Sequence, residues 1–156
     1  MKILLIGNGA REHCIAEALG SNKGTTLFSY LKSRNPGILP LSKGFELGNY
    51  NDLSKIKNYA KKIKPDFAFI GPEEPLSNGV ADVLRKIGIE SIGPTKELAQ
   101  LETSKSFTRN LLQKYKIKGN PKFGIFNKNN ILDAKKFLDE IEKCVIKPDG
   151  LTGGKG

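Results

Sequence analysis

The sequence predicts an α/β protein: a small doubly wound parallel sheet, followed by the start of a second domain. Short apolar runs alternate with amphipathic helical patterns through residues 1–92, an order that gives parallel strands joined by helical crossovers. The first run, residues 3–6, leads directly into a glycine-rich turn at residues 7–9. After Gly93-Pro94-Thr95 the pattern changes and the chain becomes strongly basic, which marks the passage to the second domain.

The elements of the first part follow from hydrophobic spacing, from capping residues and from helix breakers. We expect strands at residues 3–6, 25–31, 66–70 and 89–92, and helices at residues 11–19, 52–64 and 77–87. Residues 32–48 contain Asn35-Pro36-Gly37 and Pro40, too many breakers for a helix, so this stretch is expected to be irregular.

The second part begins with a helix that Thr103 can cap, with Phe107 and Leu111 on its apolar face. We expect a strand at residues 122–126, a helix from about residue 130 to residue 142, and a strand at residues 144–147. The predicted domains are therefore residues 1–102 and 103–156.

The turn after the first strand reads Gly7-Asn8-Gly9-Ala10-Arg11-Glu12. Free N–H groups at a helix start face anions, and a cation such as Arg11 in a first turn is mildly unfavourable unless an anion lies beside it. The dinucleotide fingerprint needs a glycine where Glu12 stands and an acidic residue about twenty positions later, and the chain has neither. The turn thus favours a phosphate over NAD, with an ordinary strand-to-helix turn as the simpler interpretation.

A second feature of the first part is Gly71-Pro72-Glu73-Glu74-Pro75-Leu76, directly after the third predicted strand. Its prolines fix the backbone, so we expect a stiff loop that presents carboxylates. Ligands of such sheets lie beyond the carboxyl ends of the strands. Residues 7–12 and 71–76 should therefore converge, unless the acidic loop is only a stiff, solvated turn.

The last nine residues hold four glycines, with Lys147 just before them and Lys155 among them. Such a segment can fold over a polyphosphate, although it lacks the Walker order and could also be a frayed tail. Lys105 lies in a first helical turn, as Arg11 does, which again suggests a neighbouring phosphate unless Lys105 is a surface lysine.

Composition narrows the class of protein. No apolar run approaches the roughly 20 residues of a membrane span and no signal peptide opens the chain, so we expect a cytoplasmic protein with no membrane partner. Cys14 and Cys144 are expected to be reduced and buried, and they form no metal site. The net charge of +10 could favour nucleic acid, but no aromatic residues alternate with the lysines as a base-stacking platform requires.

Five spaced motifs carry a resemblance that runs the whole length of the chain. They are Gly7-Asn8-Gly9-x-Arg11-Glu12-His13, Gly71-Pro72-Glu73-x-Pro75-Leu76, Ile92-Gly93-Pro94-Thr95, Leu101-Glu102-x-Ser104-Lys105-x-Phe107 and Ile146-Lys147-x-Asp149-Gly150-Leu151-x-x-Gly154-Lys155-Gly156. In this order they closely resemble the phosphoribosylamine–glycine ligase family, ATP-grasp ligases of purine biosynthesis. The resemblance implies a Rossmann-like, pre-ATP-grasp substrate domain at residues 1–102 and the incomplete start of an ATP-grasp domain at residues 103–156.

The resemblance also implies a reaction and its binding residues. ATP phosphorylates the carboxylate of glycine, and the amine of 5-phosphoribosylamine attacks the glycyl phosphate, releasing ADP and phosphate. Glu73 would hold a ribose hydroxyl or the amine. The residues implied for the substrate phosphate are Asn8, Gly9, Ala10, Arg11 and Glu12. Those implied for ATP are Lys105, Lys147, Gly153, Gly154, Lys155 and Gly156.

The resemblance places the Mg²⁺ or Mn²⁺ ligands, the adenine clamp and the glycine site in a remainder beyond residue 156, and no metal ligand in this chain. We therefore expect the 156 residues alone to be inactive, to bind phosphoribosyl ligands weakly, and to be monomeric. Residues 29–37 match the family only loosely, and His13 is interpreted as structural. The alternatives are another ATP-grasp ligase acting on a different purine intermediate or a carboxylate and, more remotely, a basic nucleic-acid-binding domain without catalysis.

Overall fold

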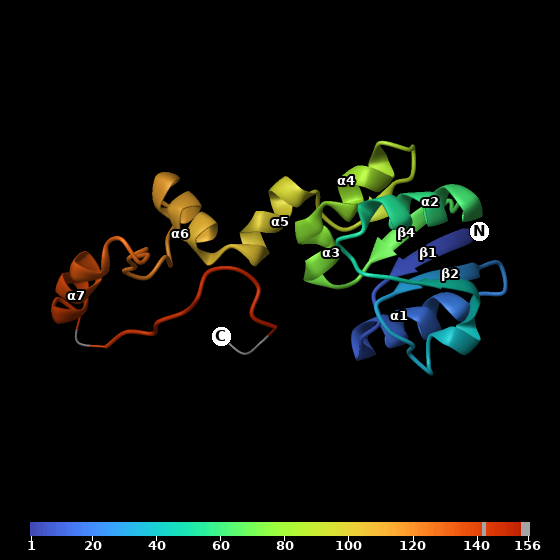
Figure 1. Ribbon diagram of the computed structural model, residues 1–156, viewed down its shortest axis with the longest axis horizontal. Coiled ribbons are helices and arrows are strands. Elements are labelled where there is room, and N and C mark those ends of the chain that lie inside the picture. Colours follow the sequence, from blue (N-terminus) through green and yellow to red (C-terminus); the bar gives the residue numbers. More distant parts are fainter. Residues whose placement is uncertain (142, 154–156) are drawn as a thin grey trace. The chain divides into compact units, whose positions relative to one another are not determined.

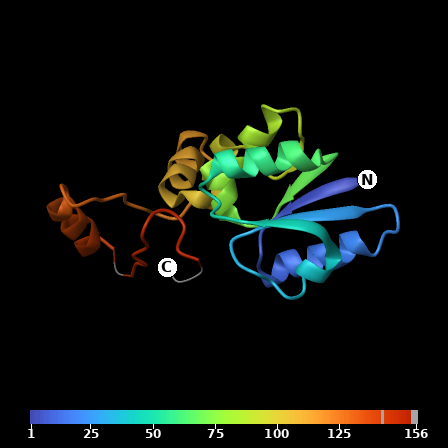
Figure 2. The ribbon, with the colours of Figure 1, turned by 45° about the vertical axis from the view of Figure 1, so that its right-hand side comes forward.

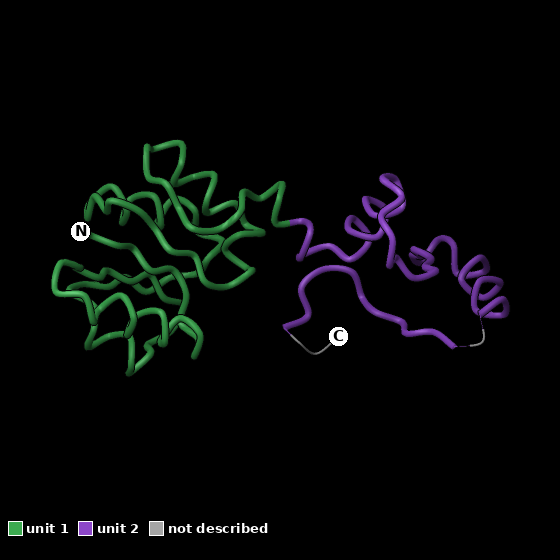
Figure 3. Tube along the Cα trace, turned by 180° about the vertical axis from the view of Figure 1, so that it is seen from behind, with its two compact units in different colours: residues 1–99 green, residues 100–156 purple. Residues whose placement is uncertain are grey.

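The structure, a computed structural model, describes residues 1–141 and 143–153. The chain divides into two compact units, residues 1–99 and 100–156 (Figure 3). The boundary lies within one helix, α5 (Lys96–Thr103). The sequence does not predict this helix, because its weak apolar pattern directly follows the Gly93-Pro94 break.

A parallel sheet of five strands forms the centre of the first unit (Figure 1). The strands are β1 (Lys2–Ile6), β2 (Thr26–Leu31), β3 (Ser42–Leu47), β4 (Phe67–Ile70) and β5 (Ser91–Ile92), in the order β3-β2-β1-β4-β5. Each neighbouring pair is parallel. The predicted doubly wound α/β fold is confirmed, with β1 at its centre.

Helices cover both faces of this sheet. Figure 2 shows α1 (Ala10–Gly20) on one face, and α2 (Leu53–Ile63) and α4 (Val80–Arg85) on the other. Alternate residues of β1 enter two different cores: Leu4 and Ile6 pack with α2 and α4, whereas Ile3 and Leu5 pack with α1. Because both faces are covered, β1 reads as a continuous apolar run rather than an alternating one.

Two parts of the first unit differ from the expectation. Residues 32–48 hold a short 3₁₀ helix, η1 (Leu39–Leu41), and the edge strand β3, whose sequence Ser-Lys-Gly-Phe-Glu-Leu carries little β propensity of its own. Its pairing with β2 determines the structure there. Residues 73–78 form a helix, α3 (Glu73–Asn78), so the acidic segment is not a loop. Pro75 is compatible with α3 because first-turn N–H groups have no helical acceptor.

The second unit holds the end of α5, then α6 (Lys105–Lys114) and α7 (Ile131–Asp139). The cap of α6 is Ser104, whose hydroxyl accepts from Phe107 N at 3.2 Å; Thr103, the predicted cap, is the last residue of α5. Residues 122–126 and 144–147 are not strands, because in the described part of this unit no other strand pairs with them.

The two cysteines are free and exposed, which corrects the expectation that they are buried. Cys14 lies on the outer side of α1, whose buried positions are Glu12 and Ala16. Cys144 lies at the start of residues 144–147, which have no regular secondary structure. Among the residues described, no helix has the length and apolar character that crossing a membrane requires.

Candidate functional site

The turn from β1 into α1 is organised by the carboxylate of Glu12. This side chain is buried, with 3% of its surface exposed, and its Oε2 accepts from Gly9 N at 2.7 Å. Glu12 is the third residue of α1 and Gly9 is its cap, so the bond is the reciprocal half of a capping box. The carboxylate thus fixes the direction in which α1 leaves the sheet.

Two glycines leave room for Glu12. A Cβ added to Gly7 would lie 2.5 Å from Glu12 Cγ and 2.7 Å from Pro72 Cδ. A Cβ added to Gly71 would also collide with the Glu12 side chain. The turn after β1 and the segment after β4 therefore pack on the same carboxylate, and the predicted convergence of residues 7–12 and 71–76 is confirmed.

Arg11 connects these two segments at the surface. Its Nε lies 3.1 Å from Glu12 Oε1 and its Nη2 lies 3.3 Å from Glu73 Oε1. The hydrogen bond to Glu12, more than that to Glu73, raises the pKa of Arg11. More than half of the Arg11 side chain is exposed, so the guanidinium can meet a ligand without leaving the turn.

The N–H groups of the turn differ in whether they can donate a hydrogen bond to a bound anion. The N–H of Gly9 already donates to Glu12. The N–H groups of Ala10 and Arg11 lie in the first turn of α1, where no helical acceptor exists. The two latter N–H groups, together with the Arg11 guanidinium, form a positive cluster at a helix start, an arrangement suited to a phosphate.

Asn8 connects the turn to two other segments, the loop after β2 and the segment that carries Tyr50. Its Nδ2 donates to Ser33 Oγ at 3.0 Å, and its Oδ1 accepts from Tyr50 Oη at 2.7 Å and from Lys32 N at 3.4 Å. Its carbonyl accepts from Asn35 Nδ2 at 2.9 Å. The loop after β2, which sequence analysis left without a role, thus lies beside the candidate site.

Lys32 and Glu74 form a second ion pair at this edge of the sheet. Lys32 Nζ lies 2.7 Å from both carboxylate oxygens of Glu74 and 5.5 Å from the centre of the Tyr50 ring. Burial raises the pKa of Tyr50, which therefore stays a neutral donor to Asn8. Glu74 belongs to the acidic segment singled out in the sequence, whereas nothing in the sequence indicates a role for Lys32 or Tyr50 or pairs residues this far apart in the chain.

His13 has a structural position, as expected. Its ring fills the space where a Cβ of Gly37 would stand, which ties α1 to the loop after β2. Its Nε2 lies 3.3 Å from Glu17 Oε1 on the outer side of α1.

In the second unit, Lys105 reaches the start of the glycine-rich segment. Its Nζ donates to the carbonyl of Gly150 at 2.8 Å, and its N–H donates to Asp149 Oδ1 at 2.7 Å. Lys147 is exposed, and Gly153 is exposed with a φ of +58°. Gly154, Lys155 and Gly156, the other predicted ATP-binding residues, lie outside the described residues.

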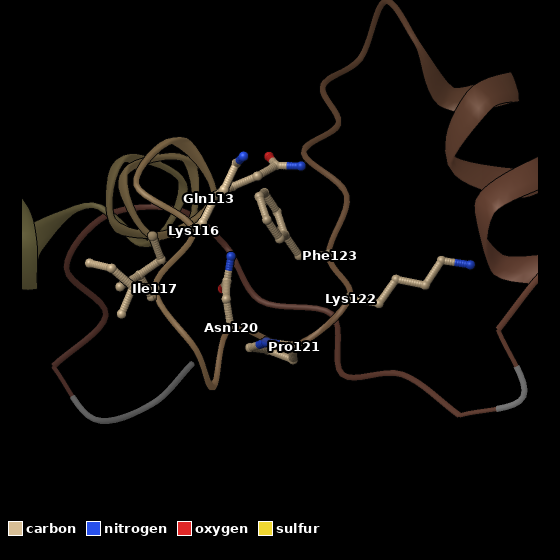
Figure 4. A pocket seen from close by; sticks show the side chains of 8 residues that line it. Gln113, Lys116, Ile117, Asn120, Pro121, Lys122 and Phe123 are labelled. Atoms are coloured by element: carbon tan, nitrogen blue, oxygen red, sulfur yellow. The ribbon is translucent and has the colours of Figure 1, made fainter.

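The second unit also contains a cavity of about 400 Å³ between the last turn of α6 and the residues that follow it (Figure 4). It is lined by Leu112, Gln113, Lys116, Ile117, Asn120, Pro121, Lys122 and Phe123. None of these is a predicted site residue, so this cavity has no part in the site described above. Within residues 1–141 and 143–153, no three His, Cys, Asp or Glu side chains gather closely enough to hold a metal ion.

Comparison with protein families divides the chain at the same helix, α5. Residues 1–102 match the model of the phosphoribosylglycinamide synthetase N domain, and residues 103–156 match that of the phosphoribosylglycinamide synthetase ATP-grasp (A) domain. Together the two matches cover the whole chain.

Similar curated proteins are named phosphoribosylamine–glycine ligase. Those of Methanococcus vannielii and Methanocaldococcus jannaschii are 51% and 49% identical over 160 residues, and that of Pyrococcus furiosus is 45% identical over 157. The alignments cover all of this chain but only 35–36% of each relative. The chain thus spans about a third of the length of these proteins.

Solved structures share the fold at low identity. Phosphoribosylglycinamide synthetase from Anaerococcus prevotii has a TM-score of 0.64 at 16% identity, covering 87% of this chain and 34% of its own. N5-carboxyaminoimidazole synthetase from Staphylococcus aureus, solved with ADP, has a TM-score of 0.68 at 16% identity, covering 88% and 36%. At this identity the similarity concerns the fold alone.

Replacing Glu12 by alanine tests its part in the turn. We expect Glu12→Ala to lower the free energy of unfolding by about 1–3 kcal/mol, because the part-buried hydrogen bond to Gly9 N and the packing of the buried Glu12 side chain are both lost. Glu17→Ala is the matched control, an exposed glutamate on the same helix, and should cost less than about 1 kcal/mol. Urea denaturation measures both, and equal losses would contradict the assigned role of Glu12.

Asp149 gives the second unit a measurable pH dependence. Hydrogen bonds from the Ser106 hydroxyl and from nearby backbone N–H groups lower the pKa of Asp149 from 3.8 to about 2. A lowered folded-state pKa stabilises the contact above the unfolded value, and that stabilisation is lost as the pH falls toward 2. Carboxyl NMR titration should show a midpoint near 2, with the Lys105 amide signal following it and the Asp149→Asn variant lacking the response. A midpoint near 3.8 would show that the contact is absent in solution.

Proposed function

The chain belongs to the phosphoribosylglycinamide synthetase family, and we propose that it forms part of a phosphoribosylamine–glycine ligase. In that reaction ATP supplies a phosphoryl group to the carboxylate of glycine. The amine of 5-phosphoribosylamine then attacks the acyl carbon, forming the amide and releasing phosphate. Relatives at 45–51% identity carry this name, and they are about three times as long, so the activity is proposed for a protein of their length.

The observation that carries the proposal is the contact between Arg11 and Glu73 at the carboxyl edge of the sheet. The N–H groups of Ala10 and Arg11 and the Arg11 guanidinium would hold the substrate phosphate. Glu73, 3.3 Å from that guanidinium, would accept a hydrogen bond from a ribose hydroxyl or from the amine of the substrate.

Other predicted substrate-binding residues would act mainly by shaping this turn. Gly9 and Glu12 bond to each other, and the buried Glu12 carboxylate is a poor neighbour for a phosphate unless Arg11 lies between them. The side chain of Asn8 already bonds to Ser33 and Tyr50. Its proposed contribution is therefore to hold the loop after β2 beside the ligand.

For the nucleotide we propose Lys105 and Lys147 as ligands of the ATP phosphates, with Gly153 and the glycine-rich end of the chain closing over them. The primary amines suit phosphate oxygens, and a solved structure with a similar fold contains ADP. Lys105 suits this role because its amine donates a hydrogen bond to the carbonyl of Gly150, in the glycine-rich segment. The ligands of the Mg²⁺ or Mn²⁺ ion are proposed to lie in the remaining length of the relatives.

No specific observation favours the two alternatives. An N5-carboxyaminoimidazole synthetase shares the fold at 16% identity. This similarity concerns the fold alone and gives no support to a different purine substrate. The +10 charge remains the only support for nucleic-acid binding. Cytoplasmic location and a monomeric state stay predictions, as does the inactivity of the 156 residues alone.

The test is ADP release by the protein of the relatives' full length, given ATP, glycine and freshly made 5-phosphoribosylamine. Arg11→Ala should raise the KM for 5-phosphoribosylamine about 10- to 100-fold, because a charge-assisted contact to the phosphate is lost. The KM values for ATP and for glycine should stay within about twofold. Arg85→Ala is the control, because Arg85 pairs with Glu90 instead. ADP release that does not require glycine would overturn the proposal in favour of another acceptor.

A further inference from the structure

The N-terminus of α6 is occupied by a carboxylate from 45 residues further along the chain. Asp149 Oδ1 accepts from Lys105 N at 2.7 Å and from Ser106 N at 3.2 Å. Asp149 Oδ2 accepts from Ser104 Oγ at 3.1 Å and from the Ser106 hydroxyl. The N–H of Gly150 adds a bond to Oδ1 at 3.0 Å. Both oxygens of this carboxylate therefore carry several donors.

One consequence concerns where a phosphate can bind. The start of a helix attracts anions through its free N–H groups. At α6 the N–H groups of Lys105 and Ser106 already point at Asp149. The position of Lys105 in this first turn suggests a neighbouring phosphate or else a surface lysine, but the anion at this helix start in the structure belongs to the chain itself.

A second consequence concerns the amine of Lys105. Its Nζ donates to the carbonyl of Gly150 at 2.8 Å. Asp149 and Gly150 are thus held on α6 from both sides: the carboxylate by backbone N–H groups, the next carbonyl by the lysine amine. Gly150 has a φ of +92°, a left-handed conformation that glycine adopts readily. Lys105 and the beginning of this segment form one fixed assembly.

We propose that Asp149 is a positioning residue for ATP: it fixes the Lys105 amine and the start of the glycine-rich segment together, so that the amine meets the nucleotide phosphates while the N-terminus of α6 does not. This inference rests on the proposed function. Asp149 acts through Lys105 and touches no reacting atom. A residue that only stabilised the fold would not change the affinity for one substrate selectively.

The experiment uses the full-length protein and measures the KM of each substrate together with the Kd of ADP by calorimetry. Asp149→Ala should raise the KM for ATP and the Kd of ADP about 10- to 100-fold, with the KM for 5-phosphoribosylamine within about twofold. Asp133→Ala is the control, because Asp133 is an exposed carboxylate of α7 whose ion-pair partner, 4.0 Å away, is Lys136 of the same helix. Asp149→Glu should recover part of the loss, since a carboxylate is restored.

A double-mutant cycle with Lys105→Ala tests the route of the effect. If Asp149 acts through Lys105, Asp149→Ala should change the Kd of ADP by less than about threefold once Lys105 is alanine. Full additivity, or an unchanged Kd of ADP in folded Asp149→Ala, would overturn the inference. Should Asp149→Ala not fold, Ser106→Ala replaces it. That variant removes one hydroxyl from the carboxylate and should raise the Kd of ADP about 2- to 10-fold, whereas no rise would overturn the inference.

The same measurements separate this inference from the proposed function. A wild-type protein that binds ADP but joins no glycine to 5-phosphoribosylamine would refute the ligase assignment. The double-mutant cycle on the Kd of ADP would still test the role of Asp149 in nucleotide binding. A wild-type ligase whose ADP affinity ignores Asp149 would refute the inference alone.

Discussion

The buried carboxylate of Glu12 is the constraint on which the first unit depends. A carboxylate excluded from water is stable only with hydrogen-bonding or charged partners, and here Gly9 N and Arg11 Nε provide them. The same side chain fills the space left by Gly7 and Gly71, so it joins the end of β1 to the end of β4. This single group sets the start of α1 and brings together the segments that carry Arg11 and Glu73.

The parallel sheet then gives the site its other neighbours. Because all the strands run in one direction, the segments that follow β1, β2 and β4 leave from the same edge. Asn8, Lys32 and Glu74 meet there, and Tyr50 joins them through its hydroxyl. In the second unit a carboxylate again occupies the start of a helix, at α6, and the lysine beside it reaches the glycine-rich segment.

Sequence patterns predicted what local chemistry determines. The apolar run of β1 and the hydrophobic spacing of α2 specify their own conformations, and the order of elements predicts the sheet. The patterns failed where pairing or distant contacts decide: β3 is a strand because β2 pairs with it. Likewise, the pairing of Lys32 with Glu74 and the hydrogen bonds of Asp149 to the start of α6 join residues more than 40 positions apart, and no periodicity connects them.

The central claim is that the turn held by Glu12 is a phosphate site. Titrating the ¹⁵N-labelled 156-residue chain with ribose 5-phosphate tests it most directly. The account predicts saturable shifts of the Ala10 and Arg11 amide signals at millimolar ribose 5-phosphate. Inorganic sulfate of equal ionic strength should shift the same signals with a higher Kd, because it lacks the ribose contact to Glu73. Saturable shifts confined to α6, or none at all in the turn, would contradict it.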